Sequence, residues 1–357
     1  MVEFNENENV SYYFNLNSNI NKIAGFDLDH TIISPQFSIF PKNEYDWKYS
    51  FSEIKEKLTK LNKNYNVVIF TNQKLYHNKS KLICDRLNNF INDLGFKPSV
   101  IIAKNDDYYR KPNIGMWEFL NLNSETEIDK NNSFFIGDAA GRCYKNKKDF
   151  SSCDYKFALN IGIDFFTPQK YLNLKDPYKY LDIGTLPFEQ LKLLNLNNLN
   201  IPNKLLREII ILVGLPSCGK TTFINKFFSE YQLLNSDIHF KKVGDLKKIN
   251  NSNNKIIIDG CNHKPNKRKY FIKYANDNNY KVRAFYFNID IQLSKHLNNL
   301  KMKIIPGYKK KSSIAFTTIN KNMELPNLNE KFDSIEYINF VPLFLDNMHK
   351  SLFYQHS

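Results

Sequence analysis

Two carboxylates separated by one residue, Asp27 and Asp29, end an apolar run at 22–28. The run predicts a buried strand, and functional sites in parallel sheets gather where strands end. There, one carboxylate could attack a phosphorus atom, while the other protonates the leaving alkoxide and later activates water. A divalent cation would neutralise the phosphate charge. Taken alone, the pair could equally form an Asx turn or a helix cap without chemistry.

Three further features favour phosphate chemistry. Thr71 follows a second apolar run, and its hydroxyl could bind phosphate oxygens together with the Asn72 amide. Lys111 precedes a predicted helix and could pair with a nucleophilic carboxylate. Asp138 follows a strand-like run at 133–136, the usual place for a metal-binding carboxylate. Four unrelated turns are a poor explanation for four such groups in this order, each at a strand end or a helix start.

A phosphate-binding loop is predicted at 214–221, where Gly-Leu-Pro-Ser-Cys-Gly-Lys-Thr fits the pattern G-x-x-x-x-G-K-[ST]. It follows an apolar run at 208–213 and opens a helical stretch, so a plain glycine-rich turn is the weaker alternative. Backbone N–H groups would cradle the phosphates of ATP, Lys220 would add charge, and Thr221 would ligate Mg²⁺. The residues expected to bind the nucleotide are Gly214, Ser217, Cys218, Gly219, Lys220, Thr221 and Thr222.

A kinase also needs a base for the acceptor hydroxyl. Asp237 follows a strand-like run at 231–234 and is the candidate, with a helix N-cap as the structural alternative. Asp259 ends the strand predicted at 255–258 and could serve metal or water, or be a turn residue. Arg268, near the start of a helix, could contact the transferring phosphoryl group or the acceptor, or simply be solvated.

The elements that must position these residues alternate along the chain. Strands are predicted at 22–28, 66–70, 99–103, 133–136 and 157–160, and helices at 51–62, 79–94 and 113–120. After a proline-containing stretch, strands are predicted at 208–213, 255–258 and 281–287, with helices at 220–229, 267–277 and 291–301. Alternation of this kind predicts a mostly parallel sheet, and therefore two α/β domains in series. We place a polar N-terminal tail at 1–20, the first domain at 21–170, a linker at 171–204 and the second domain at 205–357.

Composition limits the partners. The 357 residues carry a formal net charge of +14, which favours polyanions, with nucleic acid first and an anionic membrane surface second. No apolar run approaches the roughly 20 residues of a membrane helix, so no membrane partner is expected. Basic clusters at 145–148, 241–242, 264–269 and 309–311 could contact a phosphate backbone, or be solvated surface. Five scattered cysteines fit a reducing compartment.

The first constellation resembles the haloacid-dehalogenase phosphatase superfamily. That resemblance implies that Asp27 is the nucleophile and Asp29 the general acid and base. It also implies a Mg²⁺ held by Asp27, by the backbone carbonyl of Asp29 and by Asp138.

The two sites together resemble the bifunctional polynucleotide kinase 3′-phosphatase family over nearly the whole chain. The resemblance is carried by the runs at 25–29, 70–73, 110–112, 115–117, 137–142 and 148–151, and by the P-loop. It implies removal of a 3′-phosphate from DNA and transfer of the ATP γ-phosphoryl group to a 5′-hydroxyl, with Mg²⁺ and ATP as cofactors. DNA ends at nicks, gaps and double-strand breaks are the implied partners, with RNA ends and other repair proteins as further candidates. We expect a monomer in the nucleus, or in the cytoplasm if the gene is viral.

The sequence departs from that family at several positions. His30 stands where the family has glycine, Ser236 replaces an arginine, and the lid region at 296–301 lacks the family's arginines. The animal enzymes' N-terminal phosphothreonine-reading domain has no counterpart in the roughly twenty residues before the first predicted strand. A phosphatase whose kinase half only binds ATP or DNA therefore stays open as an alternative, as does a small-molecule phosphatase/kinase fusion. A non-enzymatic basic scaffold is a further alternative.

Overall fold

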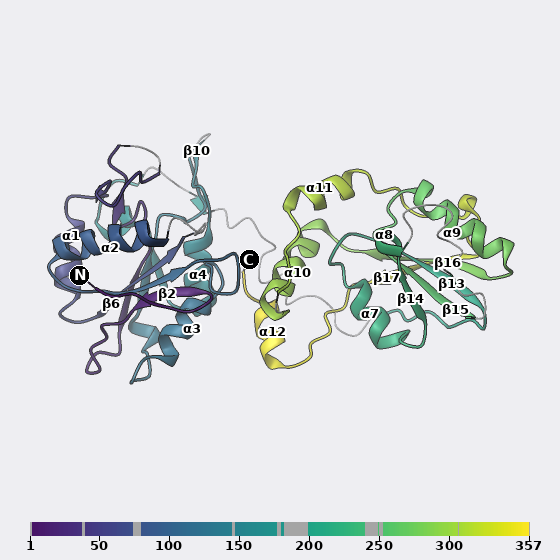
Figure 1. Cartoon of the computed structure of the whole chain (residues 1–357), viewed down its shortest axis with the longest axis horizontal. Helices are drawn as coiled ribbons and strands as arrows, with labels where there is room; N and C mark the ends of the chain where they lie inside the picture. The colour runs from purple at the N-terminus through teal and green to yellow at the C-terminus, as the bar shows by residue number, and fades with distance from the viewer. Residues whose placement is uncertain are drawn as a thin grey trace. The chain divides into compact units, whose positions relative to one another are not determined.

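The computed structural model describes residues 2–37, 40–73, 80–144, 147–176, 180–181, 199–239, 249, 253–305 and 307–356. The chain forms two compact units, the first of Met1–Thr185 with Gln355–Ser357 and the second of Leu186–Tyr354. In each, strands are flanked by helices (Figure 1). The division falls inside the predicted linker at 171–204, most of which lies outside the described residues.

Unit 1 contains a seven-stranded sheet in the order β1-β2-β7-β6-β3-β8-β11. The strands from β7 to β11 are mutually parallel, whereas β2 runs antiparallel to β7. The strands are β1 (Asn5–Glu6), β2 (Val10–Tyr13), β3 (Ile23–Phe26), β6 (Asn66–Asn72), β7 (Ser99–Ala103), β8 (Phe134–Ile136) and β11 (Asp164–Phe166). Because β3 is the middle one of the five parallel strands, the residues that follow it emerge at the sheet edge where sites of parallel sheets form.

Helices cover both faces of this sheet (Figure 1). On one face, α1 (Ile54–Leu61) and α2 (Ser80–Leu94) bury Leu58, Leu87 and Phe90 against Phe26 and Ile69. On the other, α3 (Gly115–Leu122) and α4 (Cys153–Ile161) pack against alternate residues of the same strands, in a core that includes Trp117, Phe157, Val68 and Phe70. Side chains that alternate between two apolar faces are what buried parallel strands require.

Two predictions for unit 1 are wrong. Residues 1–20 are not a tail, because β1 and β2 extend the sheet and Val10 is fully buried. Residues 157–160 are not a strand but part of α4, where Phe157, Ala158 and Ile161 form one buried helix face. The helix ends at Gly162, whose left-handed conformation suits glycine, and the true strand is β11.

Smaller elements lie around the carboxyl end of the sheet. The hairpin of β4 (Ile33–Ser34) and β5 (Lys48–Tyr49) follows Asp29 directly. A second small sheet joins β9 (Arg142–Tyr144) to β10 (Lys147–Lys148) and β12 (Tyr180–Leu181). The remaining short elements are η1 (Lys130–Asn132) and α5 (Pro168–Tyr171).

Unit 2 is built on a fully parallel five-stranded sheet in the order β14-β15-β13-β16-β17. Its strands are β13 (Glu208–Val213), β14 (Gln232–Asn235), β15 (Lys255–Asp259), β16 (Lys281–Asn288) and β17 (Ser334–Asn339). Its helices are α7 (Lys220–Phe227), α8 (Ser236–His239), α9 (Pro265–Asp277), α10 (Ile291–Ile304), α11 (Ser313–Lys321) and α12 (Asn347–Phe353), with the short η3 (Leu328–Glu330).

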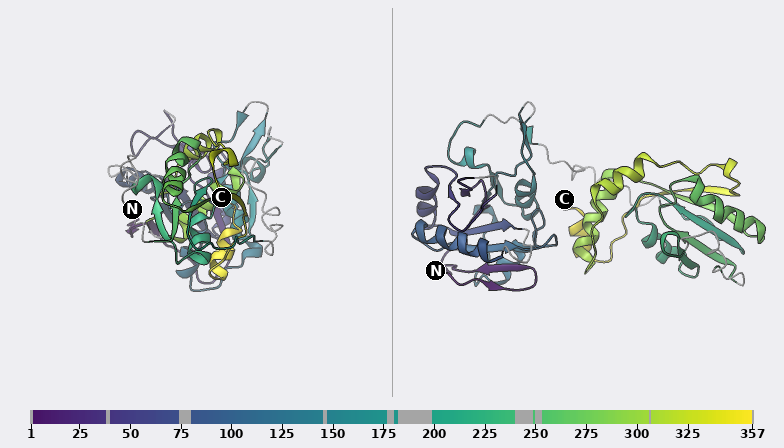
Figure 2. Two further views of the ribbon diagram at one scale, coloured as in Figure 1. Left: turned by 90° about the vertical axis from the view of Figure 1, so that its right-hand side faces the viewer. Right: turned by 45° about the horizontal axis from the view of Figure 1, so that its top comes forward.

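The helices of unit 2 also bury both faces of their sheet, with α7 and α9 on opposite sides (Figure 2). Phe223 of α7 and Phe228, which follows the helix, belong to one core cluster with Phe285, whereas Phe271 of α9 packs with Ile256. Both units are therefore α/β domains with mainly parallel sheets, as predicted. Among the described helices, none combines the length and apolarity that crossing a membrane requires.

Candidate active sites

The nucleophile candidate Asp27 lies directly after β3, in the centre of the unit 1 sheet. Its Oδ1 accepts a hydrogen bond of 2.7 Å from Nζ of Lys111, which is almost fully buried. Lys111 reaches this position because Asn72, at the end of β6, bonds both its N–H and its carbonyl. The predicted pairing of Lys111 with the nucleophile candidate Asp27 is thus seen as a direct contact.

Three carboxylates meet at this point. One oxygen each of Asp27, Asp138 and Asp154 lie within 4.8 Å of one another. Burial, with further repulsion from Asp154, raises the pKa of Asp138 to about 7. The pKa of Asp27 is raised as well, mainly by burial, against the lowering effect of Lys111. One lysine cannot balance three carboxylates of which two are buried, so the cluster fits a divalent cation bound by oxygen ligands.

Asp154 is the member of this cluster that the sequence analysis did not name. It is buried in the first turn of α4, where its Oδ1 accepts 2.7 Å from Lys111 Nζ and its Oδ2 accepts 3.0 Å from Ala139 N–H. A Cβ on Gly137 would lie 2.4 Å from this carboxylate, so only glycine fits there. An acid in a first helical turn ordinarily indicates helix-dipole stabilisation. The glycine before Asp138 was the one sequence feature that could have indicated the close approach of another side chain.

Asp29 faces different partners from Asp27. Its Oδ1 accepts 2.9 Å from Arg86 Nη1 and its Oδ2 accepts 2.7 Å from Gln73 Nε2, which also donates 2.9 Å to Thr71 Oγ1. Asp29 is therefore not among the three clustered carboxylates, and its side chain stays partly exposed. Thr31, two positions after Asp29, donates a hydrogen bond of 3.2 Å from its hydroxyl to Asp138 Oδ1.

The turn after Asp29 contains His30, which stands where the resembled family has glycine. His30 has φ of 59°, in the left-handed region that glycine adopts most easily. Its N–H donates 2.8 Å to the carbonyl of Ile33, which closes the turn into the β4–β5 hairpin. The imidazole lies 3.4 Å from the Ser34 hydroxyl on the exposed side. A histidine therefore fits this turn, at the cost of a strained backbone conformation.

In unit 2, the P-loop connects β13 to α7 as predicted. Gly214 has φ of 154° and lies so close to Cys218 and Phe287 that a Cβ would come within 3.1 Å of each, and Ser217 and Gly219 also have positive φ. The buried Lys220 Nζ donates 2.7 Å to the Leu215 carbonyl and 3.2 Å to that of Gly214. Thr221 and Thr222 are exposed at the start of α7, where hydroxyls could reach a metal or a phosphate.

The acid candidates lie at the ends of neighbouring strands. Asp259 ends β15, and Asp237 is the second residue of α8, directly after β14. In the parallel pair β14–β15, Asn235 is in register with Asp259, so both acids belong to the same sheet edge as the P-loop. The structure describes the backbone of Asp237 but not its side chain, so its predicted role as general base stays a prediction.

The α10–α11 connection lies next to the P-loop. Tyr308 Oη lies 3.4 Å from Ser217 Oγ and donates 2.9 Å to Asn298, while Ser294 Oγ bonds the Pro216 carbonyl. Burial lowers the pKa of Lys301, and the charge of Lys220 lowers it further. Lys301 belongs to α10, at the end of the predicted lid region 296–301.

Arg268, predicted to act at the reacting phosphate, is held by partners within the fold. Its side chain is fully buried and forms a bidentate pair with Glu330, at 2.8 and 2.6 Å. Nη1 also donates to the carbonyls of Asn262 and Glu324. The guanidinium thus joins the loop after β15 to η3, and its donors are engaged within the fold.

Replacing Arg268 with Met is expected to lower the free energy of unfolding of unit 2 by about 3–5 kcal/mol, because Glu330 would lose its buried partner. Thermal unfolding followed by calorimetry measures this loss, with the exposed neighbour Lys269→Met as the control. A kinase rate that falls in Arg268→Met at unchanged thermal stability would instead support the catalytic role.

Comparison with known proteins agrees with this geometry. Residues 22–172 match the family model described as Polynucleotide kinase 3 phosphatase. A bifunctional polynucleotide phosphatase/kinase homologue from Acanthamoeba polyphaga mimivirus is 33% identical, over 89% of this chain and 85% of its own. The bifunctional polynucleotide phosphatase/kinase of Schizosaccharomyces pombe is 29% identical, over 89% of this chain and 80% of its own.

A third relative matches less of the chain. The polynucleotide 3′-phosphatase ZDP of Arabidopsis thaliana is 38% identical over 42% of this chain and 24% of its own. The first two relatives extend over both units, with the phosphatase constellation in one and the P-loop in the other. The chain therefore belongs to the bifunctional polynucleotide phosphatase/kinase family.

Proposed function

We propose that unit 1 removes the 3′-phosphate from DNA ends and that unit 2 phosphorylates 5′-hydroxyl ends with ATP. The observation that carries the phosphatase assignment is the buried Asp27–Lys111 pair beside two further carboxylates, while Asp29, two positions along the chain, is bonded to separate partners. The relatives' names supply the polynucleotide substrate class.

The proposed reaction has two balanced steps. An oxygen of Asp27 attacks phosphorus, the bond from phosphorus to the 3′-oxygen breaks, and Asp29 gives that oxygen its proton. Water then attacks the aspartyl phosphate, Asp29 takes back a proton, and inorganic phosphate leaves with Asp27 restored. Lys111 holds the Asp27 carboxylate in place during both steps. The Thr71 hydroxyl would bind a phosphate oxygen, whereas the Asn72 amide, predicted to act with it, is bonded to the main chain of Lys111.

Mg²⁺ is the proposed cofactor of unit 1. Asp27, Asp138 and Asp154 would hold it, since hard oxygen ligands in a buried anionic cluster suit this ion. Bound there, it neutralises phosphate charge that the carboxylates would otherwise repel. In unit 2, Thr221 would ligate a second Mg²⁺ beside ATP, and Lys220 with Lys301 would offset phosphate charge.

Charge and exposed rings support a nucleic-acid substrate. The loop between β4 and β5 exposes Phe37, Phe40 and Tyr45 by 71%, 77% and 70%, next to the turn that carries Asp29. Exposed rings beside a basic surface can stack unpaired bases without reading their sequence. In unit 2, Lys264, Lys267 and Lys269 are exposed around the start of α9, whereas Lys145, Lys241 and Lys242 lie outside the described residues.

Substrate competition tests this assignment against a small-molecule function. The full chain with Mg²⁺ would be given an oligonucleotide 3′-phosphate, the same oligonucleotide with a 5′-phosphate, and a free sugar phosphate. We expect phosphate release from the first only. Faster release from the sugar phosphate would contradict the polynucleotide assignment while leaving the aspartate chemistry intact.

Replacing Asp154 with Asn is expected to weaken Mg²⁺ binding to unit 1 by about 10–100-fold, because the cluster loses one negative charge while the amide oxygen can still accept from Lys111. The Mg²⁺ concentration that gives half-maximal phosphatase activity measures the effect. Asp164→Asn, an exposed acid on β11, is the matched control and leaves that concentration unchanged. An equal shift in both variants would exclude Asp154 as a ligand.

The stabilisation of unit 1 by Mg²⁺ is expected to increase with pH between 6 and 8. Because the pKa of Asp138 is raised to about 7, the folded protein without metal gains a proton there as pH falls, and that proton competes with the cation. The metal-free fold accordingly loses stability as pH rises toward 7. The change in Tm on adding Mg²⁺ should be larger at pH 8 than at pH 6, and a change independent of pH would contradict this.

A further inference from the structure

Arg86 is a buried cation that the reaction above does not use. It lies in α2 and is 2% exposed, and it is among the largest fully buried side chains of the chain. Nη1 donates 2.9 Å to Asp29, while Nε and Nη2 have no hydrogen-bond partner among the described residues. A guanidinium withdrawn from water needs a partner charge, and Asp29 supplies it.

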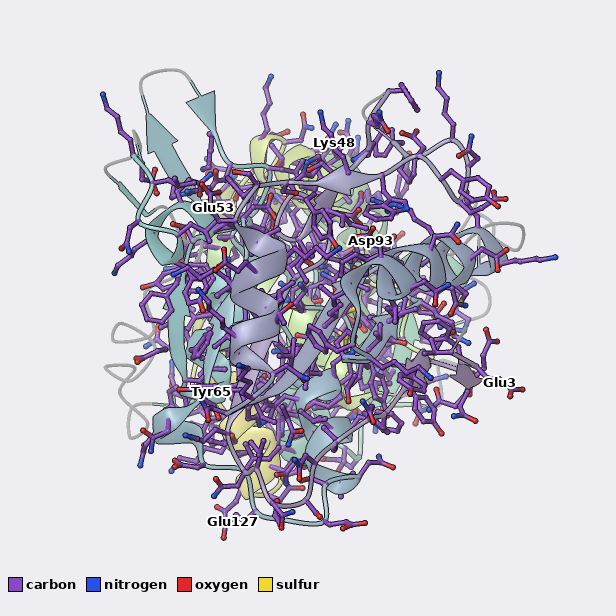
Figure 3. All side chains as sticks on the ribbon, turned by 90° about the vertical axis from the view of Figure 1, so that its left-hand side faces the viewer. Glu3, Lys48, Glu53, Tyr65, Asp93 and Glu127 are labelled. Carbon is purple, nitrogen blue, oxygen red and sulfur yellow. The ribbon has the colours of Figure 1, made fainter. Side chains whose placement is uncertain are left out.

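Arg86 lies in the region where α2 faces the loop between β4 and β5. In Figure 3, α2 lies beside α1, with Asp93 labelled near the end of α2 and Glu53 at the start of α1. Asp46, also buried, accepts N–H bonds from Gln36, Phe37 and Lys42. Burial raises the pKa of Asp46, but these bonds and the charge of Arg86 outweigh that effect and lower it. Arg86 thus contacts Asp29 directly, and its charge also acts on Asp46, whose bonds hold the loop between β4 and β5.

Asp27 and Asp29 are each bonded to a different cationic side chain. Lys111 holds Asp27 at the carboxylate cluster, whereas Arg86 and Gln73 each bond one oxygen of Asp29. Without Arg86, one side of Asp29 would lose its fixed contact. The carboxylate would then be free to turn toward Lys111 or a bound cation, away from its part in proton transfer.

We propose that Arg86 is a positioning residue for the acid-base step, holding Asp29 apart from the Asp27–Asp138–Asp154 cluster so that it serves the leaving oxygen and the attacking water. The proposal rests on the proposed phosphatase function. It also has a consequence that a merely structural role lacks. A sugar alkoxide needs a proton in order to leave, whereas nitrophenolate leaves without one, so only the first reaction depends on Asp29 at the bond-breaking step.

The test compares two rates on the full chain with Mg²⁺: single-turnover phosphate release from an oligonucleotide 3′-phosphate, and the burst of nitrophenolate from 4-nitrophenyl phosphate. In Arg86→Met we expect the first to fall by about 10–100-fold and the second to stay within about threefold. Arg86→Lys should restore most of the first rate because it keeps a charge beside Asp29. Lys81→Met, an exposed cation on the same helix, should change neither.

A second arm uses the double variant. If Arg86 acts through Asp29, Asp29→Asn with Arg86→Met is no slower than Asp29→Asn alone. Equal losses on both substrates in Arg86→Met, or a further loss in the double variant, would overturn the proposal. Should Arg86→Met fold poorly, Arg86→Gln is compared by the ratio of the two rates, since unfolded protein lowers both equally. A wild-type chain that acts on the aryl ester but not on the oligonucleotide would refute the proposed function instead.

Discussion

Asp27→Asn is expected to lower 3′-phosphatase activity by at least about three orders of magnitude while leaving 5′-kinase activity unchanged. The amide cannot form the covalent bond to phosphorus, yet its oxygen can still accept the 2.7 Å hydrogen bond from Lys111. Phosphate release from a 3′-phosphorylated oligonucleotide measures the first activity, and transfer of labelled phosphate from ATP measures the second.

Protein stability provides the control for this variant. The pKa of Asp27 is raised because its ionised form is poorly solvated and repelled by its neighbours. A neutral isostere should therefore keep or increase the Tm of unit 1. If the Asp27→Asn chain retains phosphatase activity within tenfold of wild type, another group is the nucleophile. If it binds nucleic-acid ends and acts in cells as wild type does, the scaffold alternative regains support.

Lys220→Met is expected to have the complementary effect, a loss of at least about 100-fold in kinase activity with the phosphatase unchanged. Lys220 is buried at the base of the P-loop, where its ammonium bonds two loop carbonyls, and a nucleotide phosphate would compete for that charge. Lys226→Met, an exposed lysine on the same helix, is the matched control. Kinase activity that survives in Lys220→Met would mean that the loop has no part in transfer.

The positions of Asp27 and Asp138 could be predicted from sequence because each comes shortly after the end of a strand. Parallel strands bring their carboxyl ends to one sheet edge, so chain order and apolar runs suffice to place these groups together. The P-loop is predictable for the same reason, since strand, loop and helix are contiguous.

Asp154 and Arg86 could not be predicted in that way. Each belongs to a helix, and which of its side chains reaches the site depends on how that helix packs on the sheet. The strand predicted at 157–160 was wrong for a different reason. An apolar run this short shows neither the strand period nor the helix period, so the sequence does not distinguish the two structures. The ion pair of Arg268 with Glu330 could not be predicted either, because Glu330 is 62 positions away and no sequence pattern links the two residues.

One incubation tests the central claim, that both units of this chain process nucleic-acid ends. The purified full chain, Mg²⁺ and ATP are mixed with a nicked duplex that carries a 3′-phosphate and a 5′-hydroxyl at the nick, and intact-mass spectrometry follows each strand. The account predicts loss of one phosphate from the 3′ end and gain of one at the 5′ end. Loss without gain would contradict the kinase assignment and leave a phosphatase whose second unit holds ATP or DNA. No change at either end would contradict the account as a whole.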